Sequence, residues 1–173
     1  MSRPERRAAT VSRRTRLAVS LLASPADAWL ALRMVGWRLV LPLLKGRLSI
    51  TRLVRLMWSG KRARPVTAAR EARVAEIARV VYRSEHVSRR GNCLERSLVL
   101  YRYLSAAGAD PHLVVGMRGS EAPVRGHAWV TVRGEPVEEP PQSLEGLTRV
   151  VSFHGDGSQP RSSRATEAQG AAP

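Results

Sequence analysis

The sequence predicts an α+β fold in which a helix that carries the single cysteine packs on an antiparallel sheet, with a basic helical region before it. Three observations lead to this prediction. Apolar residues recur with helical spacing over residues 69–83 and 93–107. From residue 112 onward the pattern changes to short strand-like runs separated by turn residues. Residues 15–58 are rich in leucine, tryptophan and arginine, which indicates two or three further helices.

The first part of the chain is predicted to hold a tail followed by helices. Residues 1–14 are polar and basic, as expected of a disordered tail. Residues 15–66 form the basic helical region. Within it, Ser24 followed by Pro25 is a typical helix start. Pro42 and Gly46 are expected to interrupt the helices.

No cleaved signal peptide and no membrane span are expected. The uncharged run Leu17–Ala26 has only 10 residues, which is short for a signal sequence. Asp27, Arg33 and Arg38 break the apolar stretch that follows, whereas a span needs about 20 apolar residues. One cysteine cannot form an internal disulfide, which indicates a reducing compartment. Together these features favour a cytoplasmic protein.

Residues 67–155 are predicted to form the core of the fold. A helix over residues 69–83 carries one apolar stripe. The next helix begins at Asn92 or Cys93 and runs to Ala107. Asn92 and Glu95 have the spacing of a capping box, and Gly108 is a typical helix end.

The sheet is predicted from strands over residues 112–118, 126–132 and 136–139, with one more inside 144–153. Arg133-Gly134-Glu135 is predicted as a tight turn between the second and third strands. Residues 156–173 are polar and of low complexity, so we expect a disordered tail.

The positive charge is concentrated in the first half of the chain. Residues 1–75 hold 17 Lys and Arg against 3 Asp and Glu, while residues 76–173 hold 12 against 11. Such a field favours an acidic peptide, an anionic membrane or a nucleic acid. No nucleic-acid motif accompanies it, so we expect no nucleic acid partner and keep peripheral membrane contact as an alternative. The alternative interpretation of this charge is a solvated, arginine-rich surface without a specific partner.

Cys93 and His127 are the residues most suited to chemistry. A cysteine in the first turn of a helix meets unpaired backbone N–H groups and the positive end of the helix dipole, and both favour the thiolate. His127 begins a strand and is the best candidate for its base, with Trp129 placed to shield the pair from water. The opposing interpretation is a small buried thiol and a packed histidine. The four histidines are well separated along the chain, so neither a metal site nor a cofactor is expected.

A third residue should orient the histidine, and two glutamates compete for that role. With a two-residue turn at Arg133-Gly134, Trp129 pairs with Glu138, which then lies on the face of His127. With a three-residue turn and a bulge, Trp129 pairs with Glu139 instead. Spacing alone does not choose between them.

Several blocks of the chain, over about residues 70–140, resemble one family. The sequence resembles the transglutaminase-like cysteine proteases of lasso-peptide biosynthesis, which remove the leader from ribosomally made precursors. The resemblance rests on Cys93-Leu94-Glu95-Arg96-Ser97-Leu98, Leu113-Val114-Val115-Gly116-Met117-Arg118, Gly126-His127-Ala128-Trp129-Val130 and Gly134-Glu135-Pro136-Val137.

The resemblance implies a transglutaminase- or papain-like core with a Cys-His-acid triad of Cys93, His127 and Glu139, and Glu138 as the alternative acid. The family typically has an aspartate as the acid, so the glutamate is a departure. The resemblance also implies a stand-alone leader peptidase of antibiotic biosynthesis. Its partners would be the precursor's leader region, a separate leader-recognition protein and a lasso cyclase.

Two other functions remain open from the sequence. The same triad would serve an acyltransferase or transglutaminase-like enzyme that passes the acyl group to an amine. A protein without enzymatic activity would instead use residues 1–75 as a basic adaptor for a membrane or a partner. The sequence does not specify the precursor, its cleavage site, any nucleotide dependence or the oligomeric state.

Overall fold

The computed structural model describes residues 24–60, 66–82, 92–118, 125–154 and 156–159. The predicted tail at 1–14, the run 17–23 and most of the tail beyond 156 lie outside these residues. The elements are α2 (Pro25–Lys45), α3 (Ile50–Met57), α4 (Ala68–Tyr82), α5 (Cys93–Ala107), β1 (Pro111–Arg118), β2 (Arg125–Val132), β3 (Glu135–Val137), α6 (Pro141–Leu144) and β4 (Thr148–Phe153). The strands form one antiparallel sheet in the order β3-β2-β1-β4, which confirms the α+β class.

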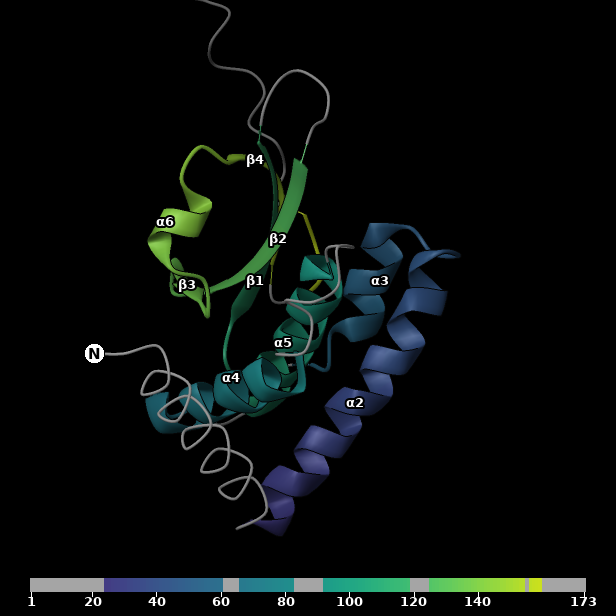
Figure 1. The fold of residues 1–173 in the computed structure, drawn as a ribbon, viewed down its shortest axis with the longest axis vertical. Coiled ribbons are helices and arrows are strands. Elements are labelled where there is room, and N and C mark those ends of the chain that lie inside the picture. The colour runs from purple at the N-terminus through teal and green to yellow at the C-terminus, as the bar shows by residue number, and fades with distance from the viewer. Residues whose placement is uncertain (1–23, 61–65, 83–91, 119–124, 155, 160–173) are drawn as a thin grey trace, which may run out of the picture.

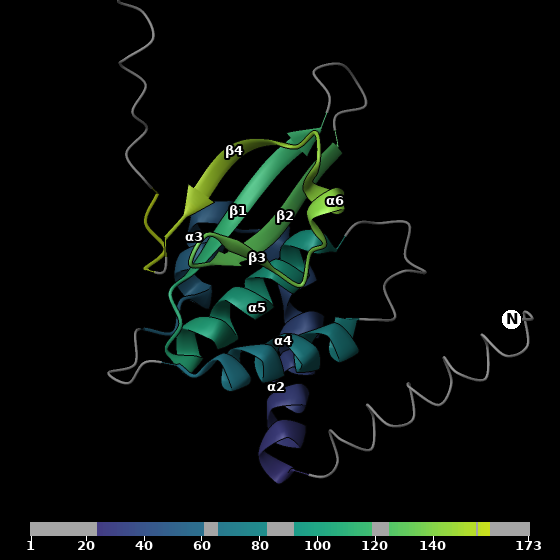
Figure 2. The same ribbon diagram turned by 90° about the vertical axis from the view of Figure 1, so that its left-hand side faces the viewer.

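Helix α5 is the centre of the molecule. It packs against β1 and β2 on one side and contacts α2, α3 and α4 on the others (Figures 1 and 2). The core between these elements is formed by side chains from all of them, and its largest fully buried members are Tyr101, Phe153, Met34, Leu41, Leu53, Met57, Ile77, Leu98, Leu104 and Leu113. One face of α2 and α3 therefore belongs to the same core as the sheet.

Helix α2 begins where the sequence predicts but passes through its proline. Pro25 is its first residue, and the Ser24 carbonyl, rather than the Ser24 side chain, accepts hydrogen bonds from the first turn. The expected interruption at Pro42 is wrong, because the helix continues to Lys45. Pro42 stands in the last turn, where it removes one hydrogen bond only, and Leu41 beside it is fully buried in the core.

Helix α5 begins at Cys93 and ends before Gly108, as predicted. The Asn92 side chain makes no capping hydrogen bond. Glu95 accepts a hydrogen bond of 2.6 Å from Lys45 Nζ of α2, and the Glu95 side chain is only 4% exposed. The ion pair between Lys45 and Glu95 joins α2 to α5 at the turn that carries Cys93.

The β2–β3 hairpin has the two-residue form of the predicted turn. Arg133 and Gly134 have φ values of 54° and 86°, and Val132 pairs with Glu135. The third strand ends at Val137, two residues earlier than predicted, because Glu138 takes a φ of 70° and turns the chain away from the sheet.

The last predicted strand, within residues 144–153, is confirmed as β4, which begins only at Thr148. The short helix α6 before it was not predicted. It lies on the opposite side of the sheet from α3 (Figure 1). Among the helices of the described ranges, none is both long and apolar enough to cross a bilayer.

Gly116 makes room for Trp129 on the face of the sheet. Gly116 of β1 lies opposite His127 of β2, and Trp129 is 2% exposed. A Cβ atom on Gly116 would stand 3.0 Å from the Trp129 indole and 3.0 Å from the backbone oxygen of Thr148. The indole therefore lies flat over β1 only because residue 116 has no side chain.

We predict that Gly116→Ala lowers the free energy of unfolding by about 1–3 kcal/mol, since the added methyl group overpacks the Trp129 site. Urea denaturation followed by circular dichroism measures this change. Gly126→Ala is the matched control, because a Cβ there meets nothing within 4 Å. Equal stability of the two variants would contradict the packing argument.

Candidate functional site

The candidate site lies where the first turn of α5 meets the open edge of β2. Strand β3 reaches only to Val137, which pairs with Val130, so the carbonyl of Ala128 has no partner strand beyond it. The Ser97 hydroxyl of α5 donates to that carbonyl at 2.8 Å. A buried carbonyl needs a donor, and Ser97 supplies the one that β3 does not. This hydrogen bond joins α5 to β2 at the residue next to His127.

Cys93 is the first residue of α5 and is half-buried. The chain turns from the end of α5 directly into β1, so the start of the helix lies at the end of the sheet where β2 begins. Ser97 stands one turn after Cys93 on the same side of the helix. The thiol therefore lies at the same end of the sheet as His127, although no hydrogen bond joins the two side chains within the described residues.

The structure brings His127 and Glu139 together. His127 Nε2 lies 3.5 Å from Glu139 Oε1, which is an ion-pair distance, and no hydrogen bond forms between the two atoms. Glu139 is 7% exposed and is held from two other elements. Arg96 of α5 forms an ion pair with its Oε1 atom, and the Ser143 hydroxyl of α6 lies 3.1 Å from Oε2 while sharing its proton with the Pro140 carbonyl at 2.7 Å. Because Nε2 faces the carboxylate, Nδ1 is the ring nitrogen left for another partner.

Glu138 points elsewhere, although the hairpin has the two-residue turn for which we expected it on the face of His127. Its carboxylate lies 2.9 Å from Arg79 Nη2 of α4, and its side chain is 3% exposed. That expectation is wrong because it assumed a continuing strand, whereas the positive φ of Glu138 ends the alternation of side chains. Burial raises the pKa of Glu138, and the charges of Arg79 and Arg96 lower it in part.

His127 lies in an environment that disfavours its charged form. Its ring stacks with that of Trp129, with 6.0 Å between centroids and 18° between planes, and its side chain is 26% exposed. Burial lowers the pKa of His127 below its ordinary value of 6.5, and the positive charges of Arg96 and Arg118 lower it further. At neutral pH the ring is therefore neutral and able to accept a proton.

Arg96, Ser97 and Ser143 hold the site together but were given no role by the sequence analysis. The signal for the first two was present, because they follow Cys93 by three and four residues and so share its side of the helix. Ser143 belongs to the unpredicted helix α6 and had no such signal. His112 and His154 contact each other at 4.9 Å between ring centroids and take no part in the site. His86 lies outside the described residues.

The fold and the sequence together define the class of this protein. The model of the transglutaminase-like superfamily matches residues 31–152, and the chain belongs to that superfamily. Within it, the chain is similar to the microcin J25-processing protein McjB of Escherichia coli, at 31% identity over 64 residues. The alignment spans 37% of this chain and 30% of the relative, so it covers under a third of that protein's length. No solved structure matches the chain.

Within the described ranges, no three His, Cys, Asp or Glu side chains cluster closely enough to hold a metal ion.

We predict that Arg96→Gln raises the pKa of His127. The substitution removes a positive charge that opposes protonation and frees Glu139 to face the ring. NMR titration of the histidine side chains measures the pKa, with His127→Asn for assignment. Arg52→Gln on α3 is the control. A pKa of His127 that falls or stays constant would show that the Arg96 charge does not act on the ring.

The lowered pKa of His127 also determines how the stability of the fold changes with pH. The folded state disfavours the protonated ring, so this residue stabilises the fold above pH 6.5 and loses that contribution as the pH falls through its lower folded-state pKa. His127→Asn should therefore flatten the acid side of the stability–pH curve. An identical curve for the variant would count against the lowered pKa.

Proposed function

We propose that this chain is a cysteine peptidase that removes the leader from a ribosomally made lasso-peptide precursor. The observation that carries the proposal is the Ser97–Ala128 hydrogen bond, which holds the Cys93 turn against β2 beside His127 and its partner Glu139. The superfamily assignment favours a thiol enzyme, and the similarity to a microcin J25-processing protein favours precursor processing as its task.

The nucleophile of the proposed reaction is the Cys93 thiolate. The amides of Cys93, Leu94 and Glu95 have no partner within the helix, and the Asn92 side chain does not cap them. Their N–H groups and the helix dipole favour the thiolate before attack. Once the thiolate attacks the carbonyl at the leader–core junction, the same groups can stabilise the oxyanion.

His127 acts as base and acid in this mechanism. A proton on Nε2, directed at Glu139, leaves the Nδ1 lone pair to take the proton of Cys93. The imidazolium then protonates the departing amine of the core peptide, and the acyl-enzyme is hydrolysed by a water that gives its proton to Nδ1. The proposal requires the thiol and the ring to come within hydrogen-bond distance when the substrate is bound.

The remaining assignments follow from this proposal. Residues 67–155 hold the catalytic side chains, and the helices before them pack on the same core. A separate recognition protein would deliver the leader, and a cyclase would act on the amine that the peptidase frees.

We predict that Cys93→Ala and His127→Ala abolish leader removal when the gene is expressed together with its neighbouring genes. Both substitutions remove a group on which acyl-enzyme formation depends. Mass spectrometry of the precursor gives the readout. Processing by both variants would end the peptidase proposal, while a product joined to an amine instead of a free carboxylate would favour an acyltransferase.

We predict that Glu139→Gln lowers the processing rate by at least about tenfold, because the amide no longer stabilises the imidazolium of His127. Glu138→Gln is the matched control, with the same change on the neighbouring residue that pairs with Arg79. Single-turnover rates compare the two variants. A larger loss in Glu138→Gln would transfer the role of the acid to Glu138.

A further inference from the structure

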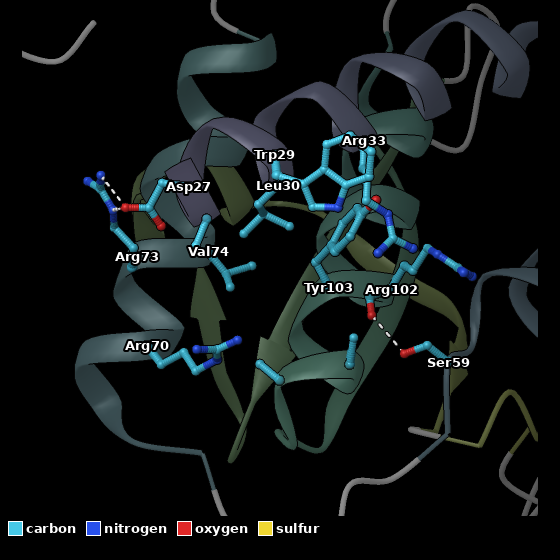
Figure 3. Close-up of a pocket in the computed structure, with 13 residues that line it drawn as sticks. Asp27, Trp29, Leu30, Arg33, Ser59, Arg70, Arg73, Val74, Arg102 and Tyr103 are labelled. Carbon is cyan, nitrogen blue, oxygen red and sulfur yellow. Dashed lines mark hydrogen bonds and ion pairs between the residues drawn. The ribbon is translucent and has the colours of Figure 1, made fainter. Parts of the chain in front are cut away.

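A cavity of about 390 Å³ opens between α2, α4 and the end of α5, away from the candidate site (Figure 3). Its walls are apolar where the helices meet. Leu30 of α2, Val74 of α4 and Tyr103 of α5 face the same opening, and Trp29 stands at its rim. A cavity of this size and character accommodates one bulky apolar side chain together with the polar group beside it.

Four arginines line this cavity, and one of them, Arg102, donates to the backbone carbonyl of Leu56 at 3.2 Å. Arg73 is neutralised by Asp27 at 2.9 Å and by Glu76 at 2.6 Å. Arg33 and Arg70, by contrast, are exposed, and neither forms an ion pair with a carboxylate in the part of the chain that the structure describes. Arg70 points toward the opening in Figure 3. These two guanidinium groups leave a positive charge at the mouth that a ligand would neutralise.

Tyr103 supplies a second, independent observation. The residue is 5% exposed, and the side chains beside its hydroxyl are Arg33 and Arg102, which can only donate hydrogen bonds. The hydroxyl proton has no acceptor among the described residues. Burial raises the pKa of Tyr103, and those arginines lower it only in part, so the hydroxyl keeps its proton. A buried donor without an acceptor costs free energy, which a ligand carboxylate in the cavity would recover.

Helix α5 relates this cavity to the candidate nucleophile. Tyr103 follows Cys93 by ten positions, which corresponds to about 15 Å along a helix. An extended peptide covers that distance with about five residues. Because α5 is buried, a peptide must go around it, so a peptide held at Cys93 would reach the cavity with residues more than about five positions from the cleaved bond.

We propose that this cavity is an exosite for an acidic peptide segment in which a carboxylate adjoins a bulky apolar side chain. The apolar side chain enters between Leu30, Val74 and Tyr103, and the carboxylate meets Arg33, Arg70 and the Tyr103 hydroxyl. That the segment belongs to the leader rests on the proposed function. The binding of such a segment to the cavity does not depend on the proposed function.

The test measures peptide binding without turnover. A fluorescein-labelled decapeptide with two adjacent Leu-Glu pairs is titrated with the full chain carrying Cys93→Ala, and fluorescence anisotropy reports the dissociation constant. We expect Arg33→Glu and Arg70→Glu each to weaken binding by about tenfold through charge reversal. Tyr103→Phe, which removes the hydroxyl alone, should weaken it by about threefold to tenfold.

Matched controls separate the cavity from the general positive charge of the chain. Arg52→Glu makes the same charge change on an exposed residue of α3 outside the cavity and should leave binding unchanged. A peptide with Gln in place of Glu should bind at least about tenfold more weakly. Circular dichroism melts check that each variant is folded.

Three results would overturn the exosite: no binding of the peptide, an equal loss in Arg52→Glu, or displacement of the peptide by inorganic phosphate at matched ionic strength. The last result would assign the cavity to simple anions. If the peptide binds as expected but the wild-type chain processes no precursor, the proposed function fails and the exosite stands.

Discussion

The early end of β3 is the constraint on which the candidate site depends. Had the strand continued beyond Val137, it would have covered the edge of β2 at Ala128 and excluded the first turn of α5. Because it stops, Ser97 bonds to the free carbonyl, and Arg96 reaches past the edge to Glu139. The same turn of the chain at Glu138 carries Glu139 toward His127. The positive φ of Glu138 thus brings together the first turn of α5, the edge of β2 and the carboxylate of Glu139.

The charged side chains around His127 act on its pKa in opposite directions, and their balance leaves the ring able to act as a base. A carboxylate next to a histidine ordinarily raises its pKa, but the charge of Glu139 is already engaged by Arg96. Burial and the nearby arginines prevail, and the ring stays neutral at neutral pH. Glu139 is then free to orient the ring through Nε2 without holding it in the protonated form. A longer acid than aspartate is compatible with this arrangement because Arg96 of α5 holds the Glu139 carboxylate by an ion pair.

The sequence predicted the features that depend on local pattern and failed where distant residues decide. Periodicity located α4, α5 and the strands, and turn chemistry identified the hairpin at Arg133-Gly134. The Asn92 side chain makes no capping hydrogen bond, and Lys45, 50 positions away, binds Glu95 in a contact that local pattern does not reveal. Likewise, Glu139 could not be distinguished from Glu138 by register, since the positive φ of Glu138 and its pairing with Arg79 of α4 arise only in the folded chain.

Helix α5 contributes residues to both the candidate active site and the cavity. Its first turn presents the cysteine with uncapped amides, and its later turns form one wall of a cavity with unpaired positive charge at the mouth. Because a helix packed on both sides is stiff, the spacing between these two sites is fixed by the core rather than by loops. A peptide that occupied both would cross the surface of the molecule, from an acidic anchor near α2 and α4 to the reactive thiol. The concentration of arginine in the first half of the chain then has a structural meaning, since Arg33 and Arg70 are where that charge meets a concave apolar surface.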